Sequence, residues 1–104
     1  MTPLQALDTN EIKVSHPQPW FAQTLTSIDG VNLRYRVIRD TVASFHVHDD
    51  SPECFLVLSG EVVVDTEAGP VTLTPGMFYR VEPGMSHRSR VVGEACLLVM
   101  DKMP

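Results

Sequence analysis

The chain has 104 residues, of which 43% are hydrophobic and 20% charged, and its formal net charge is −5. This length suits one small domain, and the negative charge argues against nucleic acid as a partner, since a phosphate backbone requires a concentrated basic surface. No apolar stretch approaches the roughly 20 residues that span a bilayer, and the amino terminus lacks the pattern of a signal peptide, so we expect a cytoplasmic protein with no membrane partner.

Residues 1–19 differ in character from the rest and are predicted to form an N-terminal arm. Thr2 and Pro3 fit an N-cap and a first helical position, which predicts a single helical turn reaching to Leu7. The prolines of the run His16–Pro19 prevent its continuation. We expect the arm to lie along the domain or along a neighbouring subunit, and we expect no function for His16.

From Trp20 onward the sequence predicts short strands separated by turns. Residues 20–28 are rich in aromatic and β-branched side chains, and Asp29 with Gly30 predicts a two-residue hairpin. Residues 31–38 then alternate with a period of two. One face carries Val31, Leu33, Tyr35 and Val37, and the other carries Asn32, Arg34, Arg36 and Ile38.

Further strands are predicted at residues 41–48, 53–58, 61–66, 71–73, 77–81, 87–92 and 95–100. At least eight short strands without any helix of three turns indicate an all-β sandwich or barrel that occupies residues 20–104 as a single domain. Cys54 and Cys96 lack the spacing of a disulfide framework or a structural zinc site. We expect each of them to be a small buried side chain.

Four side chains of metal-ligand type fall in three of these segments. His46 and His48 are one residue apart, so both imidazoles project from one face if residues 41–48 form a strand. Glu53 follows a polar reversal and opens an apolar strand, where an inward carboxylate requires a partner. His87 would be the fourth ligand. Three imidazoles and a carboxylate suit one divalent transition metal ion, namely Fe, Mn, Ni, Co or Zn.

Each of these residues also has a simpler interpretation. His46 and His48 alone fit two solvent-facing imidazoles on an edge strand, and Glu53 alone fits a polar strand start. The four residues taken together favour metal ligation. By alternation, the side chains of Phe55, Val57, Ser89 and Val91 would line the pocket beside the ion, with Val57 and Val91 better described as core. Further candidates for substrate contact are Tyr35, Phe78, Tyr79 and Arg80.

At these positions the sequence resembles the cupin superfamily, whose fold is a double-stranded β-helix, or jelly roll. The first motif of that family has the form G-x5-H-x-H-x3/4-E-x6-G. Its spacings are matched by His46, His48, Glu53 and Gly60, with Asp40 where the family has its leading glycine.

The second motif of the family has the form G-x5-P-x-G-x2-H-x3-N. It is matched by Gly76, Gly84 and His87, while Glu82 replaces the proline and Val91 the asparagine. The resemblance covers about residues 35 to 100. The layout is similar to the small single-domain cupins grouped with mannose-6-phosphate isomerase-like proteins, and it implies a jelly-roll barrel with a metal held by His46, His48, Glu53 and His87.

The resemblance does not specify a reaction, because the same fold carries dioxygenases, isomerases, decarboxylases and non-catalytic binding proteins. We expect a metal-dependent enzyme of the dioxygenase or isomerase type that acts on a small polar molecule inside the barrel. The alternative is a non-catalytic metal-binding, small-molecule-binding or sensor protein. A metal-free jelly roll of the sugar-epimerase kind fits poorly, since it gives the four ligand residues no joint purpose.

Four protein ligands on a six-coordinate ion would leave two positions for water, oxygen or substrate. The sequence identifies no separate catalytic acid or base. The expected partners are a small-molecule ligand or substrate and a second copy of the chain, because the exposed edges of a small sandwich favour a homodimer.

Overall fold

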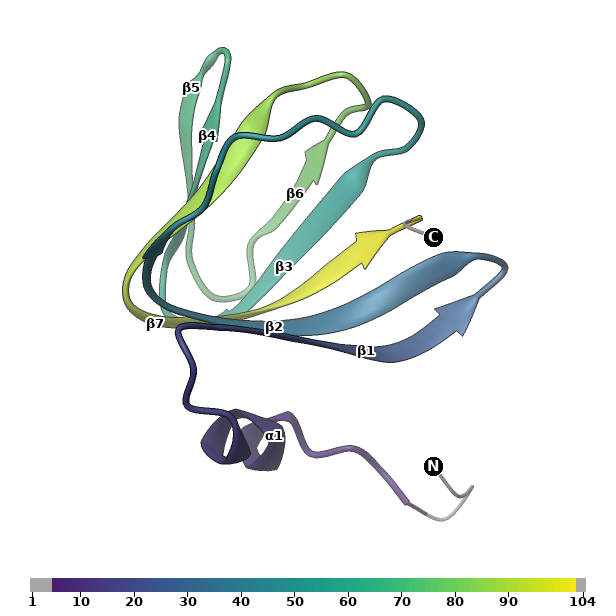
Figure 1. Cartoon of the computed structure of the whole chain (residues 1–104), viewed down its shortest axis with the longest axis vertical. Coiled ribbons are helices and arrows are strands. Elements are labelled where there is room, and N and C mark those ends of the chain that lie inside the picture. Colours follow the sequence, from purple (N-terminus) through teal and green to yellow (C-terminus); the bar gives the residue numbers. More distant parts are fainter. Residues whose placement is uncertain (1–4, 103–104) are drawn as a thin grey trace.

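A computed structural model describes residues 5–102, which form an antiparallel β structure with one short helix (Figure 1). The elements are α1 (Thr9–Ser15), β1 (Trp20–Ile28), β2 (Val31–Val42), β3 (Glu53–Ser59), β4 (Val62–Thr66), β5 (Gly69–Leu73), β6 (Phe78–Val81) and β7 (His87–Asp101). The predicted all-β double-stranded β-helix is confirmed. No helix among the described residues is long and apolar enough to cross a membrane.

The long strand β7 joins the two layers of the fold. Residues 87–90 of β7 pair with β4, which also pairs with β5, whereas the later residues of β7 pair with β2 and β3. The other strands are hydrogen-bonded in the order β1-β2-β7-β3-β6, and β4 and β5 branch from this order at β7. Every pairing is antiparallel. Figure 1 shows the strands curling around a common interior, with α1 outside, below β1 and β2.

Both long strands bend where Asp40 of β2 meets Gly93 of β7. Asp40 has φ 44 and Gly93 has φ 80, and Oδ1 of Asp40 accepts a hydrogen bond from the Gly93 amide at 2.7 Å. Aspartate is one of the few residues that tolerate the left-handed region. Asp40 therefore adopts the backbone conformation for which glycine is the usual residue.

This bend corrects the predicted strand boundaries. Residues 87–92 and 95–100 were expected as two strands, but they form the single strand β7, which continues through Gly93. Residues 31–42 also form one strand, with a register shift between Arg39 and Thr41. The described residues therefore contain seven strands in place of the eight or more that were predicted.

The main core lies in the interior between the layers. It is formed by side chains that are almost completely buried: Ile38, Phe55, Val57, Val62, Val64, Leu73, Val81, Val91, Ala95, Leu97 and Val99. A smaller cluster of Tyr35, Val37 and Cys96 lies on the outer face of the sheet, against Ile12 of α1 and Phe21 of β1. The alternation predicted for residues 31–38 therefore separates inner from outer faces. Both cysteines are buried and unpaired, as expected.

The helix of the arm begins later than predicted. Leu7 lies outside any helix, and Thr2 and Pro3 lie outside the described residues. Helix α1 is instead capped by Asp8, whose Oδ1 accepts a hydrogen bond from the Asn10 amide at 2.9 Å. The cap explains why the helix starts at Thr9.

Arg39 of β2 holds the arm against the domain. Its Nη1 donates hydrogen bonds to the carbonyls of His16 and Gln18, both at 2.8 Å, and its Nη2 donates one to Lys13 at 3.2 Å. Its Nε pairs with Glu94 of β7 at 2.8 Å. The arm therefore lies along its own chain, which is the first of the two expected positions.

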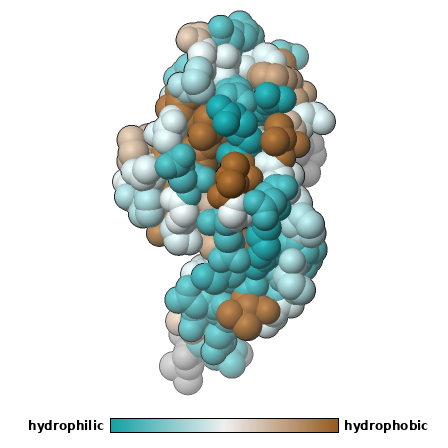
Figure 2. Space-filling view, turned by 90° about the vertical axis from the view of Figure 1, so that its left-hand side faces the viewer, coloured by the Kyte–Doolittle hydropathy of each residue, from teal (hydrophilic) through white to brown (hydrophobic). Residues whose placement is uncertain are grey.

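The surface shows no continuous apolar band on the face drawn in Figure 2. Hydrophobic patches on that face are separated by hydrophilic side chains, and the lobe below the body is mostly hydrophilic.

His16, at the end of the helix, stacks on Phe21 with ring centroids 3.9 Å apart, and its Nδ1 lies 2.7 Å from the carbonyl of Ile12. These contacts give His16 a structural place in the arm.

Candidate metal centre

His46 and His48 lie in the loop between β2 and β3, so the strand predicted over residues 41–48 is wrong beyond Val42. His46 forms an isolated bridge with His87, made of two backbone hydrogen bonds of 2.9 and 3.0 Å. Val42 pairs with Arg90, so the chain advances four residues from Val42 to His46 but only three from Arg90 to His87. The extra residue is a bulge, so Val42 and His46 do not share a face as strict alternation along a strand would require. Val42 is consequently 61% exposed, whereas His46 lies beside His87.

Glu53 and His87 form the buried half of the site. Each is the first residue of its strand, β3 or β7, and they are only 3% and 0% exposed. Nε2 of His87 lies 2.9 Å from Oε1 of Glu53. Nδ1 of the same ring lies 2.9 Å from the Met85 carbonyl, which accepts its hydrogen bond and so directs Nε2 towards the carboxylate.

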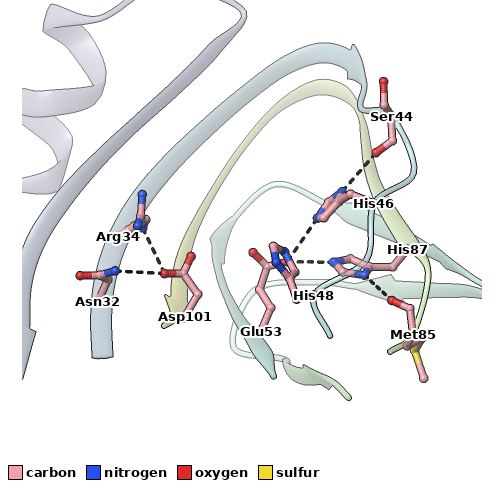
Figure 3. A network of polar contacts seen from close by, with 9 residues as sticks. All are labelled: Asn32, Arg34, Ser44, His46, His48, Glu53, Met85, His87 and Asp101. Atoms are coloured by element: carbon pink, nitrogen blue, oxygen red, sulfur yellow. Dashed lines mark hydrogen bonds and ion pairs between the residues drawn. The ribbon is translucent and has the colours of Figure 1, made fainter. Parts of the chain in front are cut away.

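The loop histidines complete the arrangement from the open side. Their Nε2 atoms lie 3.7 Å (His46) and 3.8 Å (His48) from the same Oε1 of Glu53. The Ser44 carbonyl lies 3.2 Å from Nδ1 of His46 and orients that ring. Figure 3 shows the three imidazoles gathered around the carboxylate.

The structure brings all four predicted ligand residues together. One nitrogen or oxygen atom from each of them lies within 4.8 Å of the others. Nε2 of His48 is buried without a hydrogen-bond partner among the described residues, and such an atom is costly unless something binds it. Three imidazole nitrogens and one carboxylate oxygen form a donor set for a borderline divalent ion. The residues present therefore fit a metal ion.

Burial and hydrogen bonding act in opposite directions on the two buried groups. Burial raises the pKa of Glu53, but the hydrogen bond with His87 and the charge of Arg36 bring it below its ordinary value. Burial lowers the pKa of His87, while its hydrogen bonds to Glu53 and Met85 bring it above its usual value. A metal ion that binds Nε2 of His87 takes the place of the proton there.

A cavity of about 330 Å³ is lined by three of the four residues, His46, His48 and Glu53. His46 is 42% exposed, so the centre is open to solvent on this side. Phe55 and Phe78 do not close it: Phe55 belongs to the main core, and Phe78 is 57% exposed in a hollow shared with Leu33 and Met100. The cavity is lined by Trp20, Arg36, Ala43, Ser44, His46, His48, Glu53 and Ser89.

The predicted lining is partly correct. Ser89 lines the cavity, and Val57 and Val91 belong to the core, as expected. Tyr35 is buried in the outer cluster, and burial raises the pKa of its hydroxyl. The remaining predicted contacts do not line the cavity either: Phe78 is exposed elsewhere, Tyr79 packs against the core, and Arg80 pairs with Glu82 at 2.8 Å.

Four residues that line the cavity were not predicted from the sequence, namely Trp20, Arg36, Ala43 and Ser44. Arg36 lies on the same face of β2 as Ile38, which points into the core, so the alternation already carried this signal. The guanidinium carbon of Arg36 lies 4.9 Å from the centre of the Trp20 ring. Burial lowers the pKa of Arg36, and the negative charges of Glu53 and Asp101 oppose that effect.

Comparisons with known proteins agree with this architecture. A family model described as a cupin domain matches residues 34–101. A cupin-2 domain containing protein from Shewanella frigidimarina has a TM-score of 0.83 at 18% identity, covering 91% of this chain and 92% of that chain. A cupin superfamily protein from Desulfitobacterium hafniense has a TM-score of 0.81 at 16% identity, covering 100% and 95%. KdgF from Halomonas sp. has a TM-score of 0.70 at 14% identity, covering 88% and 93%. No curated protein matches the chain.

Proposed function

This chain belongs to the cupin family, and we propose that its residues His46, His48, Glu53 and His87 bind one divalent transition metal ion, namely Fe, Mn, Ni, Co or Zn. We propose further that it is an enzyme of the dioxygenase or isomerase type, acting on a small polar molecule held in the cavity beside the ion. One observation carries the proposal. The ligand atoms of these four residues converge on one another beside a cavity that is open to solvent.

The chain's own residues account for how such a site is held. Two of the three imidazoles are oriented by backbone carbonyls, those of Met85 and Ser44, which also raises the basicity of the opposite ring nitrogen. The carboxylate of Glu53 enters at the start of a buried strand, with the core side chain of Phe55 behind it. A bound ion supplies a Lewis acid and, if it is iron, redox chemistry. The exposed side at His46 leaves a path for a ligand.

A second candidate function is a non-catalytic metal-binding, small-molecule-binding or sensor protein. One observation favours it: among the described residues that line the cavity, the only ionisable side chain besides the candidate ligands His46, His48 and Glu53 is Arg36. A guanidinium stays protonated at neutral pH and cannot exchange a proton with a substrate. The cavity therefore contains no separate general acid or base, which a proton-transfer reaction would require.

Metal analysis of matched variants tests the binding site. Chelator-treated protein is loaded with each of the five metals in turn, and its metal content and affinity are measured. We expect one ion per chain in the wild type and at least tenfold weaker binding in Glu53→Gln and His48→Ala, because each variant removes a ligand. Glu82→Gln, which changes a carboxylate that is 57% exposed, is the matched control and keeps full affinity. Equal metal content in the wild type and both ligand variants would contradict the site.

Turnover separates the enzyme from the binding protein. Metal-loaded protein is incubated with millimolar sugars, sugar acids and 2-oxo acids, and each mixture is followed by NMR spectroscopy. Consumption of a compound in amounts far above the amount of protein, lost in His48→Ala, supports the enzyme. Saturable binding of a compound that is recovered unchanged supports the second candidate.

We also propose that the chain forms a homodimer. Its support is an apolar hollow of about 140 Å³ on the outer face, lined by Leu33, Cys54, Phe55, Leu56, Phe78, Leu98 and Met100. Phe78 and Met100 are 57% and 41% exposed there, and a second copy would cover them. Sedimentation of a species of roughly twice 11.6 kDa is the expected result. A single 11.6 kDa species at all concentrations would contradict it.

A further inference from the structure

Arg36 brings a positive charge into the cavity beside the candidate metal centre. It lies in the middle of β2, where its register partner on β7 is Leu97, a residue of the main core. Its neighbours on the cavity wall include His46, His48 and Glu53. Because side chains opposite one another in a sheet share a face, the side chain of Arg36 is directed into the interior of the barrel.

The charge of Arg36 has no carboxylate partner of its own in the part of the chain that the structure describes. Each of the other five arginines pairs with an Asp or Glu side chain at 2.8 to 3.3 Å. Among residues 5–102 no carboxylate lies within 4.0 Å of the guanidinium of Arg36, and its Nε is buried with no hydrogen-bond partner. A buried donor of this kind is costly when left unsatisfied. Arg36 is therefore the arginine that is left to bind something outside the chain.

Arg34, two residues earlier on the same face, shows the contrast. Its Nε pairs at 3.3 Å with Asp101, which is only 4% exposed (Figure 3). Asp101 also accepts a hydrogen bond of 3.4 Å from Asn32. The fold thus supplies a buried carboxylate for one inward arginine and none for the next, and it is the second that lines the cavity.

Trp20 places the guanidinium without satisfying its donors. The guanidinium carbon lies 4.9 Å from the centre of the indole ring. Stacking on an aromatic ring stabilises the cation, while the N–H groups at the edge of the plane remain available for planar oxyanions. The hydroxyl side chains of Ser44 and Ser89 line the same cavity and offer further hydrogen bonds.

We propose that Arg36 binds an oxyanion group, a carboxylate or a phosphate, of a small ligand whose other end reaches His46, His48 and Glu53. The role of the metal centre in this arrangement rests on the function proposed above, whereas the binding of an anion by Arg36 does not. A divalent ion on Glu53 leaves the cavity with a net positive charge, which strengthens the preference for an anionic ligand. The volume of about 330 Å³ limits the ligand to a small molecule.

The only tryptophan of the chain provides the readout, because it lies against the proposed anion site. Trp20 emission is recorded while the protein is titrated with succinate, with glycerol 3-phosphate, or with their uncharged counterparts succinamide and glycerol. Sodium chloride is used to keep the ionic strength constant. Each titration is made with metal-free and with metal-loaded protein, and calorimetry checks the affinities.

We expect saturable binding of succinate or glycerol 3-phosphate and none of the uncharged compounds. Comparison of the two anions identifies the carboxylate or the phosphate as the preferred group. Arg36→Gln lowers the affinity for the anion at least tenfold. Arg36→Lys keeps the charge but loses the planar fork, so its affinity lies between those of the wild type and Arg36→Gln. Arg80→Gln, a surface variant, behaves as the wild type.

Metal binding by the same variants separates this inference from the metal site. Arg36→Gln should bind metal as tightly as the wild type or more tightly, because it removes a positive charge near Glu53, and retained metal binding also shows that it is folded. If metal binding fails but the anion still needs Arg36, only the metal site is wrong. Wild-type anion affinity in Arg36→Gln, or no binding of either anion to the wild type, would overturn the inference.

Discussion

Replacement of Gly60 by alanine tests how the turn after β3 is packed. Gly60 has φ 75, and a Cβ atom there would touch the carbonyl oxygen of Glu94 and lie 2.8 Å from Cα of Ala95. Both of these atoms belong to the backbone of β7, so they cannot move aside as the end of a side chain can. Gly30 is the matched control, because it has φ 79 and a Cβ atom added there would meet no atom within 4 Å.

The two alanine variants separate conformational strain from steric overlap. Both place alanine in the left-handed region, which costs about 1–2 kcal/mol. Gly60→Ala must also displace the backbone of β7, and overpacking of this kind adds about 1–3 kcal/mol. We therefore expect a loss of roughly 3 kcal/mol for Gly60→Ala against about 1 kcal/mol for Gly30→Ala. For a domain of this size the difference lowers the melting temperature by about 10 °C.

Urea denaturation followed by circular dichroism measures both losses. The test is which variant loses more free energy of unfolding. Both variants are strained by a positive φ, whereas only Gly60→Ala also overlaps with the backbone of β7. Equal stability of the two variants, with unchanged slopes against urea concentration, would refute the close packing of this turn against β7.

Three further predictions concern the arm, the strand bend and a surface ion pair. Arg39→Ala should lower the free energy of unfolding by about 2 kcal/mol and expose the arm to proteolysis at residues 16–19, since the guanidinium holds three arm carbonyls; unchanged cleavage would contradict that role. Asp40→Ala should be about 1–2 kcal/mol less stable than Asp40→Gly, because both variants lose the hydrogen bond from the Gly93 amide and only alanine is strained at φ 44; thermal unfolding compares them, and equal stability would remove the explanation. Hydrogen bonds from Arg90 and Arg88 lower the pKa of Asp65, so its stabilising effect is present above the unfolded value of 3.8 and is lost as the pH falls through the lower folded value. Asp65→Asn should therefore lose less stability than the wild type in this acid range, and identical acid unfolding curves would count against the pairing.

The fold and the grouping of the four candidate ligand residues could be predicted from the sequence because their signals are local. A period of two in residues 31–38 follows directly from strand geometry, and the structure separates Tyr35 from Ile38 accordingly. His46, His48 and Glu53 fall in one short stretch of the chain, so their spacing could be read directly from the sequence. Only His87 had to be brought from a distant segment, and the second motif marked it.

The errors arise where one residue changes the register. The bulge between Val42 and His46 depends on pairing with β7, a strand that lies more than 40 residues away, so alternation along β2 could not reveal it. A glycine such as Gly93 usually indicates a strand end, whereas here its positive φ bends a continuous strand. The prolines at residues 17 and 19 show where a helix stops. Asp8 followed three residues later by Glu11 is a capping-box pattern that shows where the helix begins, and this signal was overlooked.

The polar lining was missed for a related reason. An arginine on the inner face of a strand looks like a solvent-facing residue until the sheet that covers it is known. The cavity wall around Arg36 comes from β1, β2, β3, β7 and the loop between β2 and β3 that contains His46 and His48. Only the folded chain brings these segments together. The division into an arm at 1–19 and a domain at 20–104, like the cytoplasmic location, stays a prediction.

The central claim is that four side chains hold one metal ion, and a crystal structure of the metal-loaded protein tests it most directly. Data collected on both sides of the absorption edge of the loaded metal locate that element alone. We expect one anomalous peak per chain, about 2 Å from a nitrogen or oxygen atom of each of His46, His48, Glu53 and His87. A peak bound elsewhere, or none between these residues in protein shown to contain the metal, would contradict it.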